Sequence, residues 1–148
     1  MSADEPDELL CEGAELVRFE QYDAFMEKQH AMLACVEMHD EDGACAYLPA
    51  LEAELQRYQE QAYVLDPFLE RLVTPVAQTM RAQVLESSCM CMAPVARLLY
   101  MYTKVRGYKV VSRFFPHQVR EMPLLLDALE RFESPTWECM YVLLLWLS

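Results

Sequence analysis

Glycine is scarce in this chain, which has three glycines among 148 residues. Tight hairpin turns depend on the positive φ that glycine adopts without strain, so the sequence disfavours a turn-rich all-β fold. Gly13, Gly43 and Gly107 also stand far apart. They cannot build the GxGxxG or GxxxxGK[ST] loops that cradle phosphates. The sequence therefore disfavours both a β-sandwich and a nucleotide-binding loop.

The chain also lacks a hydrophobic run of membrane-spanning length. Its longest apolar run, Cys139 to Leu147, has nine residues, whereas a span needs roughly 20. Hydrophobic residues nevertheless make up 54% of the chain, which is too many for a disordered tail. The first residues are acidic, where a secretory signal is basic. We expect a folded cytoplasmic protein with no transmembrane segment and with reduced thiols.

Basic residues are few and unevenly placed. The chain has 12 Lys and Arg residues and 24 Asp and Glu residues, so its net charge is −12. This negative charge is unfavourable for nucleic-acid binding. Residues 1–54 hold 15 acids and two bases, whereas residues 96–148 hold five acids and seven bases. We expect an acidic N-terminal helical segment over 1–54 and a series of helical repeats that begins at 55 and continues through 148.

Metal-ligand patterns are weak. Cys89 and Cys91 are the only closely spaced pair among six cysteines, and a structural zinc site needs four ligands. The spacing of His30, Cys35 and His39 does not place all three on one helical face. The sequence predicts no metal site.

Catalytic patterns are equally weak. His117 is the single histidine of the C-terminal half, and no Ser-rich or Gly-rich elbow lies near it. A nucleophile needs an adjacent base and an orienting group. We expect no cofactor and no intrinsic catalytic site, so the chain is not expected to be an enzyme.

Apolar residues recur at helical spacing along almost the whole chain. We expect helices within these ranges: 14–39, 48–58, 67–76, 94–106, 110–115, 124–132 and 137–147. Paired short helices favour an all-α fold, an α-solenoid of HEAT or armadillo repeats. A plain helical bundle is the alternative. Because the last helix is apolar nearly all round and has no polar outer face, we expect an N-terminal fragment of a longer array.

Several residues mark expected helix ends. Residues 40–43 (Asp-Glu-Asp-Gly) indicate a turn. Asp66 is the expected N-cap of a helix whose first residue is Pro67, and Pro75 should kink or shorten that helix. Pro94 should fall in a first turn, and Gly107 should form a left-handed C-cap.

The segment from Arg97 to Arg113 is the strongest candidate interaction site. It carries five cations and interleaved tyrosines, and no acid occurs between Glu86 and Glu121. Arginine pairs with carboxylates and tyrosine offers rigid amphipathic contacts, so an acidic protein partner fits. Alternatively, the cations neutralise the acidic first third within the fold. The candidate partner-binding residues are Arg97, Tyr102, Lys104, Arg106, Tyr108, Lys109 and Arg113.

The same segment resembles the tubulin-folding cofactor D family of tubulin-specific chaperones. Residues 99–109 (LYMYTKVRGYK) and 113–117 (RFFPH) carry the central likeness. An upstream block contains 58–61 (YQEQ) and 65–67 (LDP), and a downstream block spans 141–148. The three blocks keep the family's order over about residues 55–148.

This resemblance implies a long HEAT/armadillo solenoid that acts after the cytosolic chaperonin. The implied partners are β-tubulin, tubulin-folding cofactors C and E, and an Arf-like small GTPase. The implied role is a scaffold in αβ-heterodimer assembly that stimulates GTP hydrolysis by tubulin and is not itself a hydrolase. The alternative is a generic helical-repeat adaptor that binds another acidic protein through residues 97–113.

Overall fold

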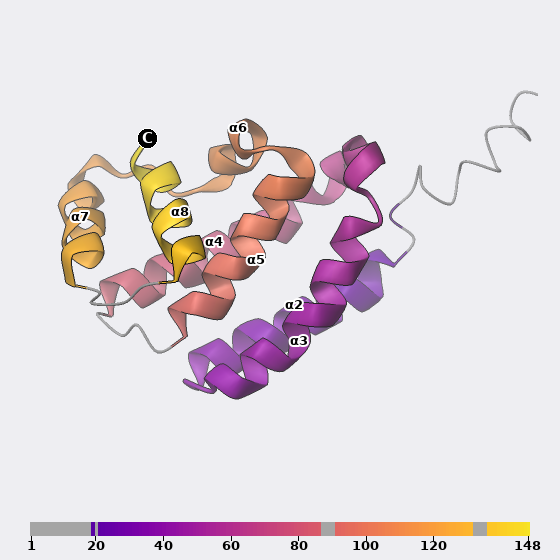
Figure 1. Ribbon diagram of the computed structural model, residues 1–148, viewed down its shortest axis with the longest axis horizontal. Coiled ribbons are helices and arrows are strands. Elements are labelled where there is room, and N and C mark those ends of the chain that lie inside the picture. Colours follow the sequence, from indigo (N-terminus) through magenta and orange to yellow (C-terminus); the bar gives the residue numbers. More distant parts are fainter. Residues whose placement is uncertain (1–18, 20, 87–90, 132–135) are drawn as a thin grey trace, which may run out of the picture.

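The chain folds into helices joined by short connections (Figure 1). The computed structural model describes residues 19, 21–86, 91–131 and 136–148. Its elements are α2 (Tyr22–Glu37), α3 (Glu41–Gln56), η1 (Gln59–Phe68), α4 (Leu69–Leu85), α5 (Met92–Arg106), α6 (Tyr108–Val111), η2 (Ser112–Phe114), η3 (Val119–Glu121), α7 (Met122–Arg131) and α8 (Trp137–Leu147). These residues contain no strand, and the all-α prediction is confirmed. No helix among them is long and apolar enough to cross a membrane.

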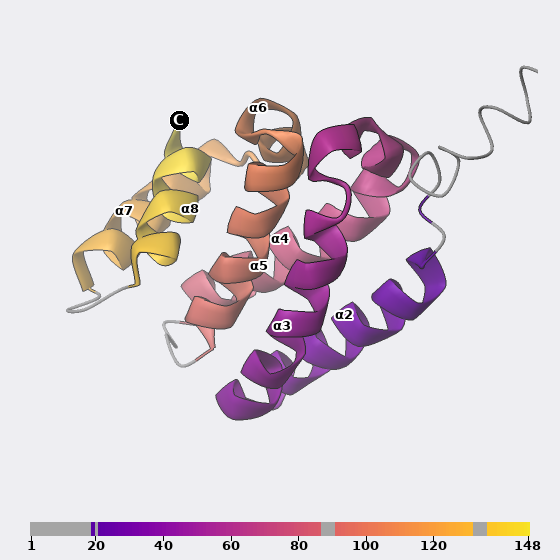
Figure 2. The ribbon, with the colours of Figure 1, turned by 45° about the vertical axis from the view of Figure 1, so that its right-hand side comes forward.

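Helix α5 occupies the centre of the fold. It packs against α3, α4 and α8 and lies between α3 and α8, while α2 lies along α3 (Figures 1 and 2). Val95, Leu98 and Leu99 of α5 are fully buried in a single hydrophobic core shared by these helices. The boundary that charge places at residues 54 and 55 falls inside α3, and the division into two segments stays a prediction.

The acidic turn predicted at residues 40–43 is the beginning of a helix, so this prediction is wrong. Asp40 is the N-cap of α3, and its Oδ1 accepts a hydrogen bond from the Gly43 amide at 2.9 Å. A β-carbon at Gly43 would collide with the Asp40 carboxylate. Glu41 and Asp42 fill the first turn, where the helix dipole stabilises negative charge. The same residues that suit a turn also suit a helix N-terminus.

The predicted helix start at Asp66 and Pro67 is also wrong. Both residues lie in the 3₁₀ segment η1, and α4 begins at Leu69 with Phe68 as its N-cap. The side chain of Phe68 has no atom that could accept a capping hydrogen bond. The Asp66 carboxylate instead pairs with Arg106 of α5, forty residues later. The Asp66 side chain, which local spacing predicts as a helix cap, is therefore used in a long-range ion pair.

The prediction for Pro94 is confirmed, that for Gly107 is confirmed in part, and that for Pro75 is wrong. Pro94 lies in the first turn of α5, as expected. Gly107 ends α5 at a positive φ of 102°, although its ψ of 139° lies outside the left-handed helical region. Pro75 does not shorten α4, which continues to Leu85. The Pro75 carbonyl accepts a hydrogen bond from Thr79 Oγ1 at 2.9 Å.

The C-terminal helices match their predictions closely. Helix α8 spans the expected residues 137–147, with Thr136 as its N-cap. Helix α7 contains Pro123 in its first turn, and the expected last residue, Phe132, lies outside the described residues. The short helix expected at 110–115 begins two residues earlier, at Tyr108. Trp146 Nε1 donates to the Pro116 carbonyl at 2.6 Å, which fixes α8 against the segment after η2.

One ion pair joins α4 to η3. Arg81 Nε donates to both carboxylate oxygens of Glu121, at 2.8 and 3.0 Å. Glu121 is largely buried. The hydrogen bonds from Arg81 lower the pKa of the Glu121 carboxyl below its ordinary value. The charged form of Glu121 is therefore favoured in the folded state.

This pair makes the fold sensitive to acid. Because the pKa of Glu121 is lower in the folded state, the stability that it contributes is present above about pH 4.3, the ordinary glutamate pKa. That contribution is lost as the pH falls through the lower folded-state pKa. We expect E121Q to lower the urea midpoint at pH 7, and the gap from wild type to shrink at pH 3. The exposed α7 variant E130Q is the control. A gap that stays constant with pH would contradict the assignment.

Candidate functional site

The candidate cations lie on α5, α6 and η2 and divide into paired and unpaired groups. Arg97 Nε lies 2.5 Å from Glu52 Oε1, and its Nη2 donates to Oε2 at 3.1 Å. This pair links α5 to α3 in the acidic first third. The alternative interpretation predicts that the cations of residues 97–113 neutralise the acidic first third within the fold. The pair of Arg97 with Glu52 matches this prediction for one of the five cations.

Arg106 is also occupied within the fold. Its Nε and Nη2 donate to the two carboxylate oxygens of Asp66, at 2.5 and 3.0 Å. The hydrogen bond that Arg106 donates to Asp66 raises the pKa of the guanidinium. A bidentate pair of this kind fixes the arginine fork in one plane. Arg106 therefore holds the end of α5 against η1, and a partner would have to compete with Asp66 for it.

Three candidate cations remain available on the surface. Lys104, Lys109 and Arg113 are exposed and form no ion pair with any residue that the structure describes. Tyr108, between them in sequence, is 50% exposed. We call these four residues the exposed basic segment. Its positive charge has no counterpart in the described part of the fold, so it can attract carboxylates from outside.

Tyr102 is placed inside the protein. Its side chain is fully buried, and its hydroxyl donates to Gln29 Oε1 at 2.5 Å. Gln29 Nε2 in turn donates to the Leu72 carbonyl at 2.9 Å. Burial raises the pKa of Tyr102 well above its ordinary value, so the phenol stays protonated. Tyr102 does not belong to the surface that the structure presents, because it connects α2, α4 and α5 in the core.

Two thiols, those of Cys91 and Cys45, lie in surroundings that disfavour thiolate chemistry. Cys91 is buried, and burial, followed by the charge of Glu41, raises its pKa. Burial and Glu41 likewise raise the pKa of Cys45. A nucleophilic or metal-binding cysteine needs the thiolate form. Over the described ranges, no three His, Cys, Asp or Glu side chains group as metal ligands; Cys89 lies outside those ranges.

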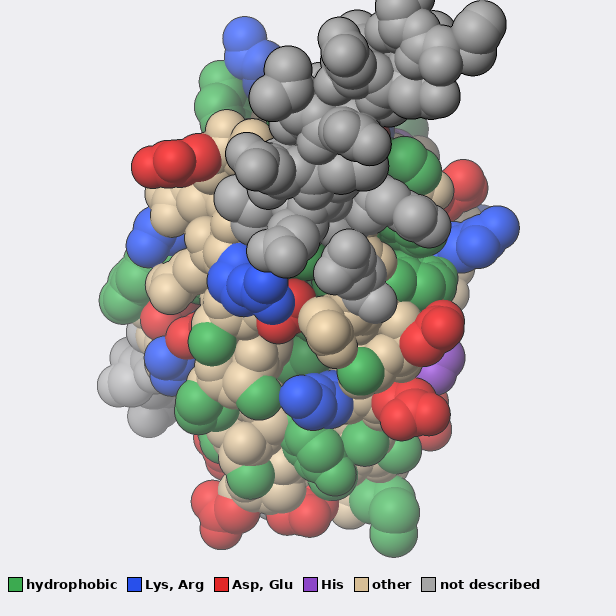
Figure 3. All heavy atoms as spheres, turned by 90° about the vertical axis from the view of Figure 1, so that its right-hand side faces the viewer, with side chains coloured by type: hydrophobic (Ala, Val, Ile, Leu, Met, Phe, Trp, Pro, Cys, Tyr) green, Lys and Arg blue, Asp and Glu red, His purple; other side chains and the backbone are tan. Residues whose placement is uncertain are grey.

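The surface beside α2, α3 and η1 carries mixed charge. Figure 3 shows acidic, basic and hydrophobic side chains interspersed over this side of the molecule, part of which is covered by residues not described. No single sign dominates the visible area. The basic character of the chain is therefore local, and the exposed basic segment is its most concentrated part in the sequence.

A family model, "Tubulin-specific chaperone D-like, ARM repeat", matches residues 55–148. The chain belongs to this family. The tubulin-folding cofactor D of Schizosaccharomyces pombe is 33% identical over 94 residues, which cover 64% of this chain and 8% of that protein. The chain thus spans less than a tenth of that curated relative. No solved structure matches the chain significantly.

Family membership accords with the geometry. The predicted α-solenoid of armadillo type is confirmed by the ARM-repeat match together with the all-α fold. The match includes η1, α4, α5, α6, α7 and α8, and hence the whole exposed basic segment. Helix α2 and nearly all of α3 lie before it. The tubulin chaperone D-like region thus carries every candidate partner-binding residue named from the sequence.

Sequence reasoning missed Gln29, the buried polar residue that binds Tyr102. A signal was present, because Phe25, Gln29, Leu33 and Val36 recur at helical spacing on one face of α2. A glutamine inside such a stripe indicates a buried hydrogen bond, since buried polar groups are nearly always paired. Tyr102 occupies the same kind of stripe on α5, four residues after Leu98 and three before Val105.

Proposed function

We propose that the chain acts as a tubulin-folding cofactor D-like scaffold that binds β-tubulin. In this role it takes part in folding after the chaperonin and in assembly of the αβ-heterodimer, together with cofactors C and E. An Arf-like small GTPase is a further proposed partner, and the complex stimulates GTP hydrolysis by tubulin. The match of residues 55–148 to the chaperone D-like family is the observation that carries the proposal.

The exposed basic segment is the proposed contact with β-tubulin. Its two lysines and Arg113 can pair with carboxylates of the partner, while Tyr108 offers an aromatic ring and a hydroxyl. Arg97 and Arg106 are already bound to Glu52 and Asp66. Their first role in this proposal is therefore to fix α5, on whose last turn Lys104 lies.

Charge reversal tests this contact. We expect K104E/K109E/R113E to lower the affinity for β-tubulin at least tenfold, because each attraction becomes a repulsion at the interface. Affinity is measured by titration of labelled β-tubulin with the purified chain. The matched control, K28E/R71E/R120E, changes the net charge equally at three exposed cations elsewhere. Circular dichroism checks that both variants keep the helical fold.

The outcomes separate the alternatives. If wild-type chain does not bind β-tubulin, transfer of the family role to this chain fails. If both triple variants lose affinity equally, binding follows net charge and the basic segment is not the contact. If only the adaptor alternative holds, the first triple variant loses another acidic partner and keeps its β-tubulin affinity.

A further inference from the structure

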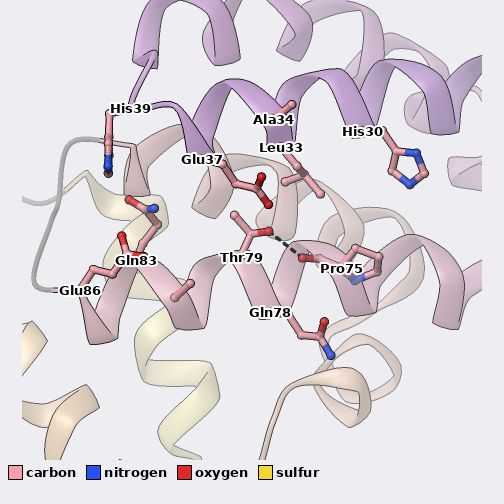
Figure 4. A pocket seen from close by; sticks show the side chains of 11 residues that line it. His30, Leu33, Ala34, Glu37, His39, Pro75, Gln78, Thr79, Gln83 and Glu86 are labelled. Atoms are coloured by element: carbon pink, nitrogen blue, oxygen red, sulfur yellow. Dashed lines mark hydrogen bonds between the residues drawn. The ribbon is translucent and has the colours of Figure 1, made fainter.

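A polar groove lies between α2 and α4, on residues that the proposed function does not use (Figure 4). Its volume is about 520 Å³, enough for a long side chain and part of its backbone. The Glu37 side chain extends from α2 toward α4, and Gln83 and Glu86 lie at the end of the groove beside His39 (Figure 4). The groove thus has acceptor groups on both walls.

The groove carries unbalanced negative charge. Glu37 and Glu86 are exposed, and neither forms an ion pair with a described residue. No lysine or arginine is among the residues that line the groove. Two carboxylates without a neighbouring lysine or arginine attract positive charge.

An unpaired buried amide points to the same chemistry. Gln83 is 3% exposed, and its Oε1 has no hydrogen-bond partner. Buried polar atoms are nearly always paired, so this acceptor lacks a donor. Gln83 lines the groove, and its amide extends from α4 toward the end beside His39 (Figure 4). A donor that enters the groove can therefore satisfy it.

The apolar part of the groove lining can contact the methylene groups of a long side chain. Leu33 and Ala34 of α2 and Pro75 and Ala82 of α4 line the groove between the polar groups. Long cationic side chains bury their methylene groups on such surfaces and keep the charged end among polar atoms. The groove thus combines an apolar wall with acceptors, as a basic side chain requires.

We propose that the groove binds an arginine side chain from a basic segment of a partner protein. The guanidinium is planar and carries five donors, so it can pair with a carboxylate of the groove and still donate to the Gln83 carbonyl. A lysine ammonium is a compact point charge and does not present this fork. This site is independent of the proposed tubulin contact, because the groove lies on α2 and α4.

The test uses purified full chain and a fluorescein-labelled Gly-Arg-Gly peptide, followed by anisotropy. The matched peptide replaces arginine with citrulline, which keeps the shape and removes the charge. A third peptide carries lysine. We expect the arginine peptide to bind at least tenfold more tightly than the citrulline peptide, and more tightly than the lysine peptide.

Variants of the groove give the second arm. We expect E37Q/E86Q to weaken binding of the arginine peptide at least tenfold, because the groove loses both negative charges that attract the cation. The control E70Q/E130Q removes the same charge at exposed positions outside the groove and should leave affinity unchanged. Q83M keeps side-chain length, removes the acceptor, and should weaken binding severalfold while circular dichroism shows an intact fold.

Several results would overturn the site. Equal affinity for arginine and citrulline peptides would exclude recognition of the charge. Equal affinity for the lysine peptide would exclude recognition of the guanidinium. Full affinity in E37Q/E86Q, an equal loss in E70Q/E130Q, or full affinity in Q83M would place binding elsewhere.

Discussion

Replacing Tyr102 with alanine is expected to lower the free energy of unfolding by about 3–5 kcal/mol, the usual cost of removing a buried aromatic side chain. Tyr102 is fully buried in α5, and its ring lies edge-on to Phe25 of α2, with centroids 6.5 Å apart. Alanine would leave a cavity there and would also leave Gln29 Oε1 without its donor. Urea unfolding followed by far-ultraviolet circular dichroism measures the loss.

Smaller changes separate the hydrogen bond from the packing. Tyr102→Phe keeps the ring and leaves Gln29 Oε1 unpaired, which should cost about 1–3 kcal/mol. Gln29→Leu leaves the Tyr102 hydroxyl unpaired at a similar cost. The double variant removes both partners, so its loss should be smaller than the sum of the two single losses. Additive losses would show that the two side chains act independently.

Local sequence signals were sufficient to predict the bounds of helices whose ends depend on nearby residues. The bounds of α8 follow from Thr136 and the apolar run after it, and Gly107 ends α5 because glycine accepts a φ of 102°. The beginning of α3 was misjudged, since Asp40 and its acidic neighbours suit a turn and a helix N-terminus equally well. Only the packing of α2 on α3 separates these two outcomes.

Contacts between distant residues account for what the sequence could not predict. Asp66 was assigned to a cap, but it pairs with Arg106 across 40 positions. Glu52 and Arg97 are 45 positions apart. Both pairs require the fold to bring α3, η1 and α5 together, and no local pattern carries that information. As a result, the sequence identifies five candidate cations but does not indicate which three of them remain unpaired in the fold.

The groove was hidden for a similar reason. Glu37 and Glu86 stand 49 positions apart in the sequence, and each by itself suggests only a solvated helix face. Gln83 becomes informative only when its burial and its unpaired Oε1 are known. Charge balance placed an excess of acid in residues 1–54, but it could not indicate that a carboxylate from α2 and one from α4 would line the same groove.

Replacing Trp146 with alanine is the second change with a large expected effect. The indole is almost completely buried and lies against Phe115, with ring centroids 5.6 Å apart. We expect a loss of about 3–5 kcal/mol in the free energy of unfolding. Because Trp146 holds α8 against the segment after η2, amide hydrogen exchange in α8 should rise more than exchange in α2.

The second tryptophan supplies the control for this prediction. Trp137 is 59% exposed, and no hydrogen bond joins its indole N–H to a described residue. Trp146→Phe removes the bond to the Pro116 carbonyl and should cost about 1 kcal/mol, whereas Trp137→Phe should change stability little. Trp137→Phe also leaves Trp146 as the sole indole, whose fluorescence then reports the docking of α8. Equal losses in the two phenylalanine variants would show that the hydrogen bond to Pro116 does not hold α8 in place.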